Sequence, residues 1–110
     1  MIPVVGHQKN AVIDFIKNTF KDNEDLFQFA HQDEQLGTGH AVMQSEKFLS
    51  GFEGDTLILS GDVPLLRAST VQSFIDFHRK NDFDASLISA VFNDPHGYGR
   101  VLRDASGNFL

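Results

Sequence analysis

The 110-residue sequence contains no cysteine, and this absence excludes disulfides, thiolate metal sites and thiol nucleophiles at once. Cations are also scarce: nine lysines and arginines, scattered along the chain, oppose 15 acidic residues and leave a formal net charge of −6. Domains that bind nucleic acid electrostatically usually carry a basic patch, so this composition argues against a nucleic-acid partner. No apolar run reaches the length of a membrane span, and no basic-then-apolar leader opens the sequence. We therefore expect a cytoplasmic protein with no membrane partner.

Tryptophan is absent and tyrosine occurs once, whereas phenylalanine occurs 11 times. The composition predicts one globular domain whose core is filled with phenylalanine. Both ends are apolar, because MIPVVGH is typical of the end of a strand and GNFL stops where a strand should continue. Natural domains usually close on polar, frayed residues. We therefore expect residues 1–110 to be part of a domain, with no internal linker.

Three segments have the apolar spacing of helices. In residues 8–20, one predicted core-facing side carries Val12, Phe15, Ile16, Thr19 and Phe20. A shorter helix is expected from Gly39 or His40 to Leu49, with Thr38 as its N-cap. Residues 67–81 predict the clearest helix, with Ser69 and Gln72 as a capping box. Its apolar face consists of Val71, Phe74, Ile75 and His78.

Strand signals alternate with these helices. LFQFAH, residues 26–31, has strand character, and TLILSGD, residues 56–62, is typical of a strand buried on both faces of a parallel sheet. ASLISAVF, residues 85–92, predicts another strand, and residues 100–110 predict a hairpin around 105–108. The alternation implies parallel strands joined by crossovers, so the predicted fold class is α/β and doubly wound.

Three unusual loops follow predicted strands: QDEQLGTGH, SGDVP and DPHGYGR. In an open parallel sheet, ligands bind outside the carboxyl ends of the strands. We therefore expect these three loops to converge on one site.

In the second loop, Asp62 directly follows a predicted buried strand. A carboxylate there is well placed to hold Mg²⁺, a hard cation that prefers oxygen ligands and commonly bridges to a phosphate. The neighbouring Gly61 has no Cβ and would let a ligand approach the main chain closely. An aspartate at this position can equally cap the following turn, and position alone leaves both roles open.

In the first loop, the glycines of the Gly37–Gly39 segment admit two interpretations. They could form a cradle of backbone N–H groups at a helix N-terminus, or simply a tight strand-to-helix turn with a threonine cap. Gln32 and Gln35 each offer a donor and an acceptor, as recognition of a pyrimidine edge requires. Surface glutamines are common, however, and each alone is also explained by solvation.

In the third loop, Arg100 could meet a phosphate and Gly99 could let a sugar approach the main chain. A glycine-flexed loop entering a hairpin explains the same residues. No histidine pair has zinc-ligand spacing, and no nucleophile-elbow pattern is present; the five histidines are His7, His31, His40, His78 and His96.

Taken together and in this order, QLGTGHAV, LSGDVPLL and DPHGYGRV resemble the uridylyltransferase domain of the bacterial bifunctional GlmU family. The resemblance covers nearly the whole chain, from VVGH to the end. It implies a Rossmann-like nucleotide-diphospho-sugar transferase fold, of which this chain holds the central part of a mixed, mostly parallel sheet with flanking helices. It also implies transfer of UMP from UTP to N-acetylglucosamine 1-phosphate, giving pyrophosphate and UDP-N-acetylglucosamine for cell-wall precursors.

The resemblance assigns nucleotide-binding roles by position. Gln32 and the Gly37–Thr38 pair match the family's contacts to the uracil base. Gly61 and Asp62 match a segment whose aspartate holds the catalytic Mg²⁺. Ser60 stands where the family has a tyrosine, so one contact near the nucleotide is lost or replaced.

Gly99 matches a glycine of the family that contacts the amino sugar. The implied chemistry is in-line attack of the sugar phosphate on the α-phosphate of UTP, with pyrophosphate leaving. Such a reaction depends on positioning and charge neutralisation, so it requires no protein nucleophile.

The family pattern includes parts that residues 1–110 lack. These are an N-terminal glycine-rich loop that holds the triphosphate, later residues that bind the sugar and complete the metal site, and the acetyltransferase domain through which the family forms trimers. We therefore expect the chain alone to be inactive and its parent to be a homotrimer. Without a first strand, the segment 56–60 would expose an apolar edge, which predicts marginal stability or self-association.

Three other interpretations remain open. Another sugar-1-phosphate nucleotidylyltransferase would share the fold and the metal site but not the choice of base. A non-catalytic nucleotide-binding module would share the fold alone. A Rossmann-like methyltransferase, with Asp62 on a ribose hydroxyl, would need a glycine-rich loop after a first strand.

Overall fold

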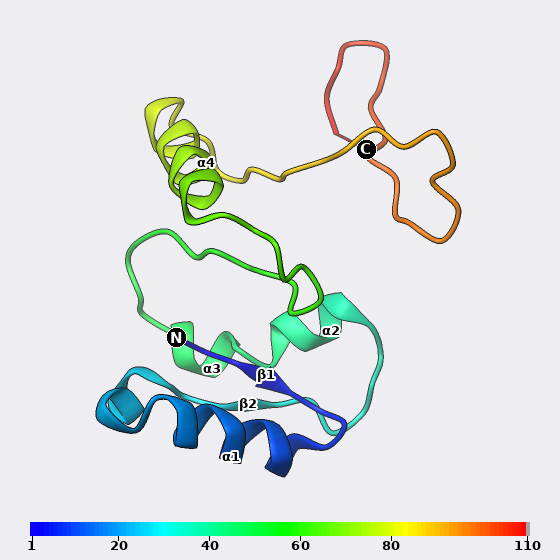
Figure 1. The fold of residues 1–110 in the computed structure, drawn as a ribbon. Coiled ribbons are helices and arrows are strands. Elements are labelled where there is room, and N and C mark those ends of the chain that lie inside the picture. Colours follow the sequence, from blue (N-terminus) through cyan, green and yellow to red (C-terminus); the bar gives the residue numbers. More distant parts are fainter. Residues whose placement is uncertain (110) are drawn as a thin grey trace. The chain divides into compact units, whose positions relative to one another are not determined.

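The computed structural model describes residues 1–109, which form two compact units that divide between Ser60 and Gly61. In the first unit, strand β1 (Val4–Val5) leads into helix α1 (Lys9–Thr19) and the short 3₁₀ helix η1 (Lys21–Leu26). The chain then returns as strand β2 (Ala30–His31) and continues into two short helices, α2 (Thr38–Met43) and α3 (Glu46–Leu49). The second unit contains one helix, α4 (Ala68–Lys80), followed by loops (Figure 1).

β1 and β2 form a parallel pair in which Val4 lies opposite Ala30 and Val5 opposite His31. Backbone hydrogen bonds extend the pairing in both directions, from Gln28 N to Met1 O at 3.0 Å and from Gln32 N to Val5 O at 2.8 Å. The strands predicted around VVGH and within residues 26–31 are thus confirmed. Because a helix joins two parallel strands, one βαβ unit of the predicted alternation is present.

α1 confirms the helix predicted for residues 8–20 but not its inward face. Its half-buried apolar side chains are Ile13 and Ile16, whereas Val12, Phe15 and Phe20 are exposed. The helix packs on β1, and a sheet of two short strands covers only a narrow stripe of it. The i, i+3 pair of isoleucines occupies that stripe.

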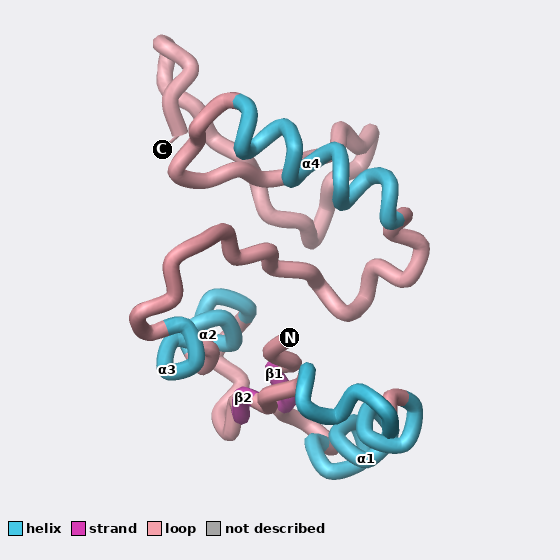
Figure 2. Tube along the Cα trace, turned by 90° about the vertical axis from the view of Figure 1, so that its left-hand side faces the viewer, coloured by secondary structure: helices cyan, strands magenta, loops and turns pink. Residues whose placement is uncertain are grey.

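α2 and α3 replace the single helix predicted from Gly39 or His40 to Leu49. The chain turns between them at Gln44 and Ser45, and Ser45 is buried. Figures 1 and 2 show these two helices on the opposite side of the β1–β2 pair from α1. The pair is therefore covered on both sides, as in α/β folds.

α4 confirms both the helix predicted for residues 67–81 and its apolar face. Val71, Phe74, Ile75 and His78 are its half-buried residues. The predicted capping box is wrong. The helix begins after Arg67, no side chain caps it, and Gln72 instead donates to the Asp76 carboxylate at 2.9 Å.

Two predicted strands, residues 56–62 and 85–92, have no β pairing within the described chain. A strand forms only where a second strand takes up its backbone hydrogen bonds, and no described residue pairs with either segment in this way. Ile58 is 63% and Leu59 56% exposed, which contradicts the predicted two-sided burial.

The hairpin predicted for residues 100–110 is present as a short turn. Arg103 and Phe109 form an antiparallel bridge, and Asp104 N donates to Asn108 O at 2.9 Å. Gly107, with φ of 87°, takes the left-handed position in this turn. Leu110, the last residue of the predicted hairpin, lies outside the described residues.

The predicted phenylalanine core is wrong for the described residues. The buried apolar residues among them are Val5 and Ala30, and the phenylalanines form local ring pairs instead. Phe20 and Phe27 have centroids 5.2 Å apart, and Phe77 and Phe83 are 5.6 Å apart. None of the helices in residues 1–109 is long and apolar enough to cross a membrane.

Candidate functional site

The residues predicted to form one site belong to both compact units. Gln32, Gly37, Thr38 and Ser60 lie in the first unit, and Gly61, Asp62 and Gly99 lie in the second. The predicted convergence of the three loops therefore stays a prediction. Within the first unit, the structure brings Gln32 and Gly37 together.

Gln32 follows β2 directly, and its side chain folds back on the start of α2. Its amide nitrogen donates to the Gly37 carbonyl oxygen at 3.0 Å and lies 3.1 Å from Nδ1 of His40. The side chain is half-buried. Two residues that the sequence placed in the same loop are thus linked by a direct hydrogen bond.

Gly37 is the N-cap residue of α2, one position earlier than predicted. Its φ of 100° lies in the range that only glycine adopts without strain. Thr38 is therefore the first residue of the helix rather than its cap, and no side chain caps α2. At the N-cap of α2 the unusual backbone conformation matters more than a side-chain hydroxyl group. The N-cap was therefore predicted one residue too late, at Thr38.

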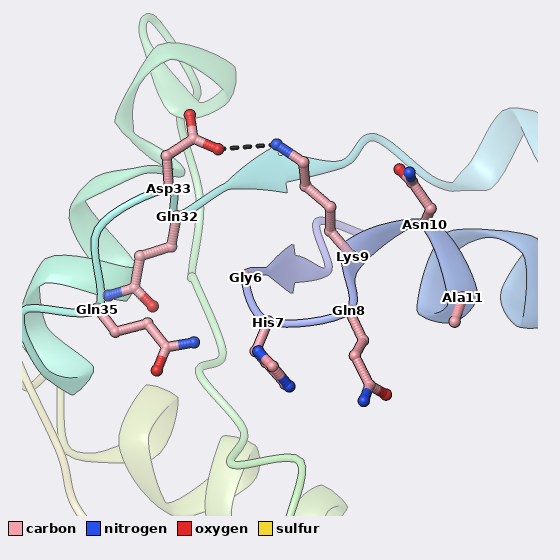
Figure 3. Close-up of a pocket in the computed structure, with 9 residues that line it drawn as sticks. All are labelled: Gly6, His7, Gln8, Lys9, Asn10, Ala11, Gln32, Asp33 and Gln35. Atoms are coloured by element: carbon pink, nitrogen blue, oxygen red, sulfur yellow. Dashed lines mark hydrogen bonds and ion pairs between the residues drawn. The ribbon is translucent and has the colours of Figure 1, made fainter.

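An open hollow of about 710 Å³ lies at the carboxyl ends of β1 and β2 (Figure 3). Its lining comes from the two segments that follow these strands: Gly6, His7, Gln8, Lys9, Asn10, Ala11, Gln32, Asp33 and Gln35. This is where ligands bind in open parallel sheets. The volume falls within the range of roughly 300–1,000 Å³ that is typical of small-molecule sites.

The amide groups of two glutamines approach Gly6 in the lining of this hollow. A Cβ on Gly6 would lie 3.6 Å from the side-chain nitrogen of Gln35 and 3.8 Å from the side-chain oxygen of Gln32. It would also come within 3.1 Å of the Gln32 backbone oxygen. The absence of a side chain at position 6 thus leaves space beside both amide groups.

An ion pair marks the rim of the hollow. Lys9 Nζ donates to the Asp33 carboxylate at 2.8 Å, joining the start of α1 to the segment after β2 (Figure 3). The hydrogen bond and the charge of Lys9 hold the pKa of the Asp33 carboxyl below its ordinary value. Both side chains are well exposed, so the pair orders the rim more than it stabilises the fold.

The sequence interpretation missed the contribution of Gly6, Gln8 and Lys9 to this hollow. Gln8 has a φ of 54°, which is unusual for a residue other than glycine. The signal that could have found them was available, because GHQK follows the predicted strand VV. The carboxyl-end rule that singled out the other three loops applies equally to this one.

In the second unit, Gly61 and Asp62 form an exposed turn. The Asp62 carboxylate has oxygen ligands suited to Mg²⁺, which is usually held by one or two carboxylates together with water and substrate phosphates. No group of three or more His, Cys, Asp or Glu residues within residues 1–109 could hold a metal ion. Asp62 could therefore supply one ligand to Mg²⁺, whereas the described residues do not form a complete metal site.

The loop around Gly99 is held by Arg100. The guanidinium donates to the carbonyl oxygen of Pro95 at 2.9 Å and to that of Tyr98. Phe92 and Tyr98 stack with centroids 5.0 Å apart. Arg100 thus fixes its own loop, whereas a Cβ on Gly99 would meet nothing within 4 Å, leaving its backbone open.

Comparison with known proteins gives consistent matches along the chain. A family model described as nucleotidyl transferase matches residues 3–109. The bifunctional protein GlmU of Geotalea daltonii is 46% identical over 105 residues, covering 96% of this chain and 22% of that protein. The GlmU of Thermoanaerobacter pseudethanolicus is 44% identical over 110 residues, covering 100% of this chain and 22% of that protein.

A third relative, the GlmU of Streptococcus pyogenes serotype M12, is 40% identical over 109 residues, covering 99% of this chain and 24% of that protein. The resemblance carried by the three sequence blocks is thus confirmed across nearly the whole chain. The chain spans about a fifth of the length of these curated relatives, 22% in the first two cases.

Proposed function

This chain belongs to the nucleotidyl transferase family, and from that premise we propose that it is the base-reading part of a UTP-dependent sugar-1-phosphate uridylyltransferase. The proposed parent enzyme is bacterial and cytoplasmic and transfers UMP from UTP to N-acetylglucosamine 1-phosphate. Its products are pyrophosphate and UDP-N-acetylglucosamine for peptidoglycan synthesis. The parent domain would have the complete Rossmann-like, mostly parallel sheet, and the parent protein would be a homotrimer.

The observation that carries the proposal is the pair of amide groups at Gly6. The side-chain oxygen of Gln32 and the side-chain nitrogen of Gln35 lie 3.8 and 3.6 Å from the position that a Cβ on Gly6 would occupy, and all three residues line the hollow. Uracil presents the complementary edge, an imide N–H beside a carbonyl oxygen. An acceptor next to a donor therefore suits uracil, whereas cytosine offers an acceptor nitrogen where uracil has its N–H.

The other predicted residues keep the roles that the resemblance implies. Gly37 and Thr38 would face the base from the start of α2, Ser60 and Gly61 would lie near the nucleotide, and Gly99 would admit the amino sugar. Asp62 would hold Mg²⁺, and the bound ion would neutralise charge on the phosphates during transfer. The oxygen of the sugar phosphate forms the new bond to the α-phosphorus of UTP, while the bond to pyrophosphate breaks.

Pyrophosphate release by the complete product of the gene that encodes these residues tests the proposal. We expect release with UTP and N-acetylglucosamine 1-phosphate in Mg²⁺, and a loss of roughly 100-fold in Asp62→Ala, because a charge-stabilising group is removed. Asp84→Ala, a matched exposed aspartate of the second unit, should retain the activity. Equal losses in both variants, or a preference for another nucleotide, would contradict the proposal.

Another sugar-1-phosphate nucleotidylyltransferase is the second candidate, and one observation favours it. Ser60 stands where the GlmU resemblance calls for a tyrosine, so this part of the nucleotide site departs from the family pattern. A competition assay with UTP, CTP, GTP and dTTP against a panel of sugar 1-phosphates would separate the two candidates.

A further inference from the structure

The nitrogen of the Gln32 side chain lies between two neighbours that determine its orientation. It is 3.0 Å from the Gly37 carbonyl oxygen and 3.1 Å from His40 Nδ1. A carbonyl oxygen can only accept a hydrogen bond, so the Gln32 atom that faces it must be the NH₂ group. If His40 Nδ1 accepts the second proton, both amide protons are engaged. Oε1 is then the atom left to meet a ligand.

We propose that His40 is a positioning residue for base recognition. Its Nδ1 accepts the second amide proton of Gln32 and thereby holds Oε1 toward the hollow. Oε1 is then an obligatory acceptor, which suits the N–H of uracil and repels the acceptor nitrogen of cytosine. The inference rests on the proposed function and adds the group that fixes the direction in which Gln32 reads the base.

Gln44 competes with Gln32 for the same imidazole. Its amide nitrogen lies 3.1 Å from His40 Nε2 and 3.0 Å from the His40 carbonyl oxygen. A neutral imidazole has one acceptor nitrogen, so the two glutamines cannot both donate to the ring. The tautomer with the proton on Nε2 is the more stable one for a histidine side chain in water. It gives the acceptor to Gln32, and the Gln44 amide then donates to the His40 carbonyl oxygen and not to the ring.

The contact between Gln32 and His40 also links two separate segments of the chain. Gln32 follows β2, whereas His40 lies in α2, eight residues later. Gln44, by contrast, lies four residues after His40 and donates to the His40 carbonyl oxygen within the same helical segment. The Gln32 contact is therefore the one that can transmit the position of α2 to the wall of the hollow.

Three substitutions of His40 separate positioning from general packing. His40→Ala removes the acceptor. His40→Asn places a carbonyl oxygen one bond beyond Cγ, where Nδ1 stood, and His40→Gln places it farther out, near the position of Nε2. Gln44→Ala is the matched control, because it removes the competing glutamine and leaves Nδ1 available.

The first measurement is the ratio of UTP to CTP affinity for the 110-residue chain and its variants, each checked for helix content by circular dichroism. We expect the ratio to fall roughly 2- to 12-fold in His40→Ala, the range for one lost hydrogen bond. It should recover in His40→Asn but not in His40→Gln, and persist in Gln44→Ala. A wild-type ratio in folded His40→Ala, or rescue by His40→Gln instead, would overturn the inference.

The second measurement needs no nucleotide. Ring ¹⁵N shifts of His40 in the free chain report which nitrogen carries the proton, and we expect Nε2. A proton on Nδ1 would overturn the inference even if UTP were selected. Absence of uridine selectivity, with the proton on Nε2 and the Gln32 amide protons protected, would instead refute the proposed function and leave the contact established.

Discussion

Gly37 holds a backbone conformation, with φ of 100° and ψ of 178°, that no other residue adopts without strain. This angle lets the chain leave β2, pass Gln32 and enter α2 with the Gly37 carbonyl aimed at the Gln32 amide. The glycines of QLGTGH therefore differ in what they do. Gly37 supplies the conformation, whereas Gly39 lies inside α2 with open space around it.

Alanine substitution should separate these two glycines. Gly37→Ala is expected to lower the free energy of unfolding by about 1–3 kcal/mol, because the strain is entirely in the backbone. A Cβ there meets nothing within 4 Å, so no steric clash contributes. Gly39→Ala, the matched control, should be neutral or stabilising by about 0.5–1 kcal/mol, since alanine is the better helix former. Urea titration of both variants measures the difference, and equal effects would refute this role for Gly37.

Asp104 carries a testable pH dependence in the hairpin. The side chain and backbone N–H of Asn108 donate to its carboxylate at 3.1 and 2.9 Å, and these bonds hold the pKa of Asp104 below its ordinary value. The stabilisation of the turn is therefore present above the ordinary aspartate range and lost as pH falls through the lowered pKa. In an NMR titration, Asn108→Ala should raise the pKa of Asp104, whereas Ser106→Ala, which keeps its backbone N–H, should not. An unchanged pKa in Asn108→Ala would contradict this account.

At the scale of elements, the sequence correctly predicts the two longest helices, because helix formation depends on the local spacing of apolar residues. α1 and α4 appear where the i, i+3, i+4 spacing placed them, and the predicted face of α4 is its half-buried face. β1 and β2 form because the backbone of each strand hydrogen-bonds to the other. Residues 56–60 and 85–92 carry equally good strand sequences but have no described strand to pair with, and periodicity cannot supply a partner.

The same distinction between local sequence patterns and tertiary contacts applies to the candidate site. The hydrogen bond from Gln32 to Gly37 lies within the loop QDEQLGTGH, so the resemblance across this one loop was enough to select both residues. The contribution of Gly6 and Lys9 depends on β1 lying beside β2, a tertiary fact that a loop-by-loop interpretation does not contain. Whether Asp62 and Gly99 complete the site depends on distances between the two units and stays a prediction.

The start of α4 predicts a stabilising substitution. Arg67 is its N-cap, with extended φ and ψ of −82° and 140°, yet no side chain caps the helix and its first turn has no acidic residue. Arg67→Asp should add a capping acceptor and a favourable charge at the helix N-terminus, gaining about 0.5–2 kcal/mol. Arg67→Ala is the control that removes the cation without adding a cap. Thermal or urea unfolding measures the stability of both variants. If the Arg67→Asp variant is no more stable than the Arg67→Ala variant, this account of the α4 N-terminus is contradicted.

At the scale of the whole molecule, few residues are buried. Val5 and Ala30 are the buried apolar residues of the described chain, and many large apolar side chains are exposed, Ile58 and Leu59 among them. Apolar surface of this kind tends to be covered by further polypeptide, either of the same protein or of another copy. The αβ pattern is thus established locally by β1, α1 and β2, while most of the apolar surface remains available for packing.

This exposure predicts self-association of the 110-residue chain through residues 56–60. Sedimentation velocity should show species larger than a monomer at high concentration, and Ile58→Lys should shift the distribution toward monomer by placing a charge in the contact. Leu65→Lys is the matched control, because Leu65 is 90% exposed and lies outside both unpaired segments. A compact monomer at every concentration, or equal effects of the two substitutions, would contradict the expectation.

The measurement that tests the central claim most directly is a calorimetric titration of the chain with UTP, CTP and GTP in Mg²⁺, with Gln32→Ala as the comparison. The account predicts weak binding that is selective for UTP and a loss of that selectivity in Gln32→Ala, because Oε1 of Gln32 reads the base. Equal binding of the three nucleotides by a folded chain, or selectivity that survives in Gln32→Ala, would contradict it.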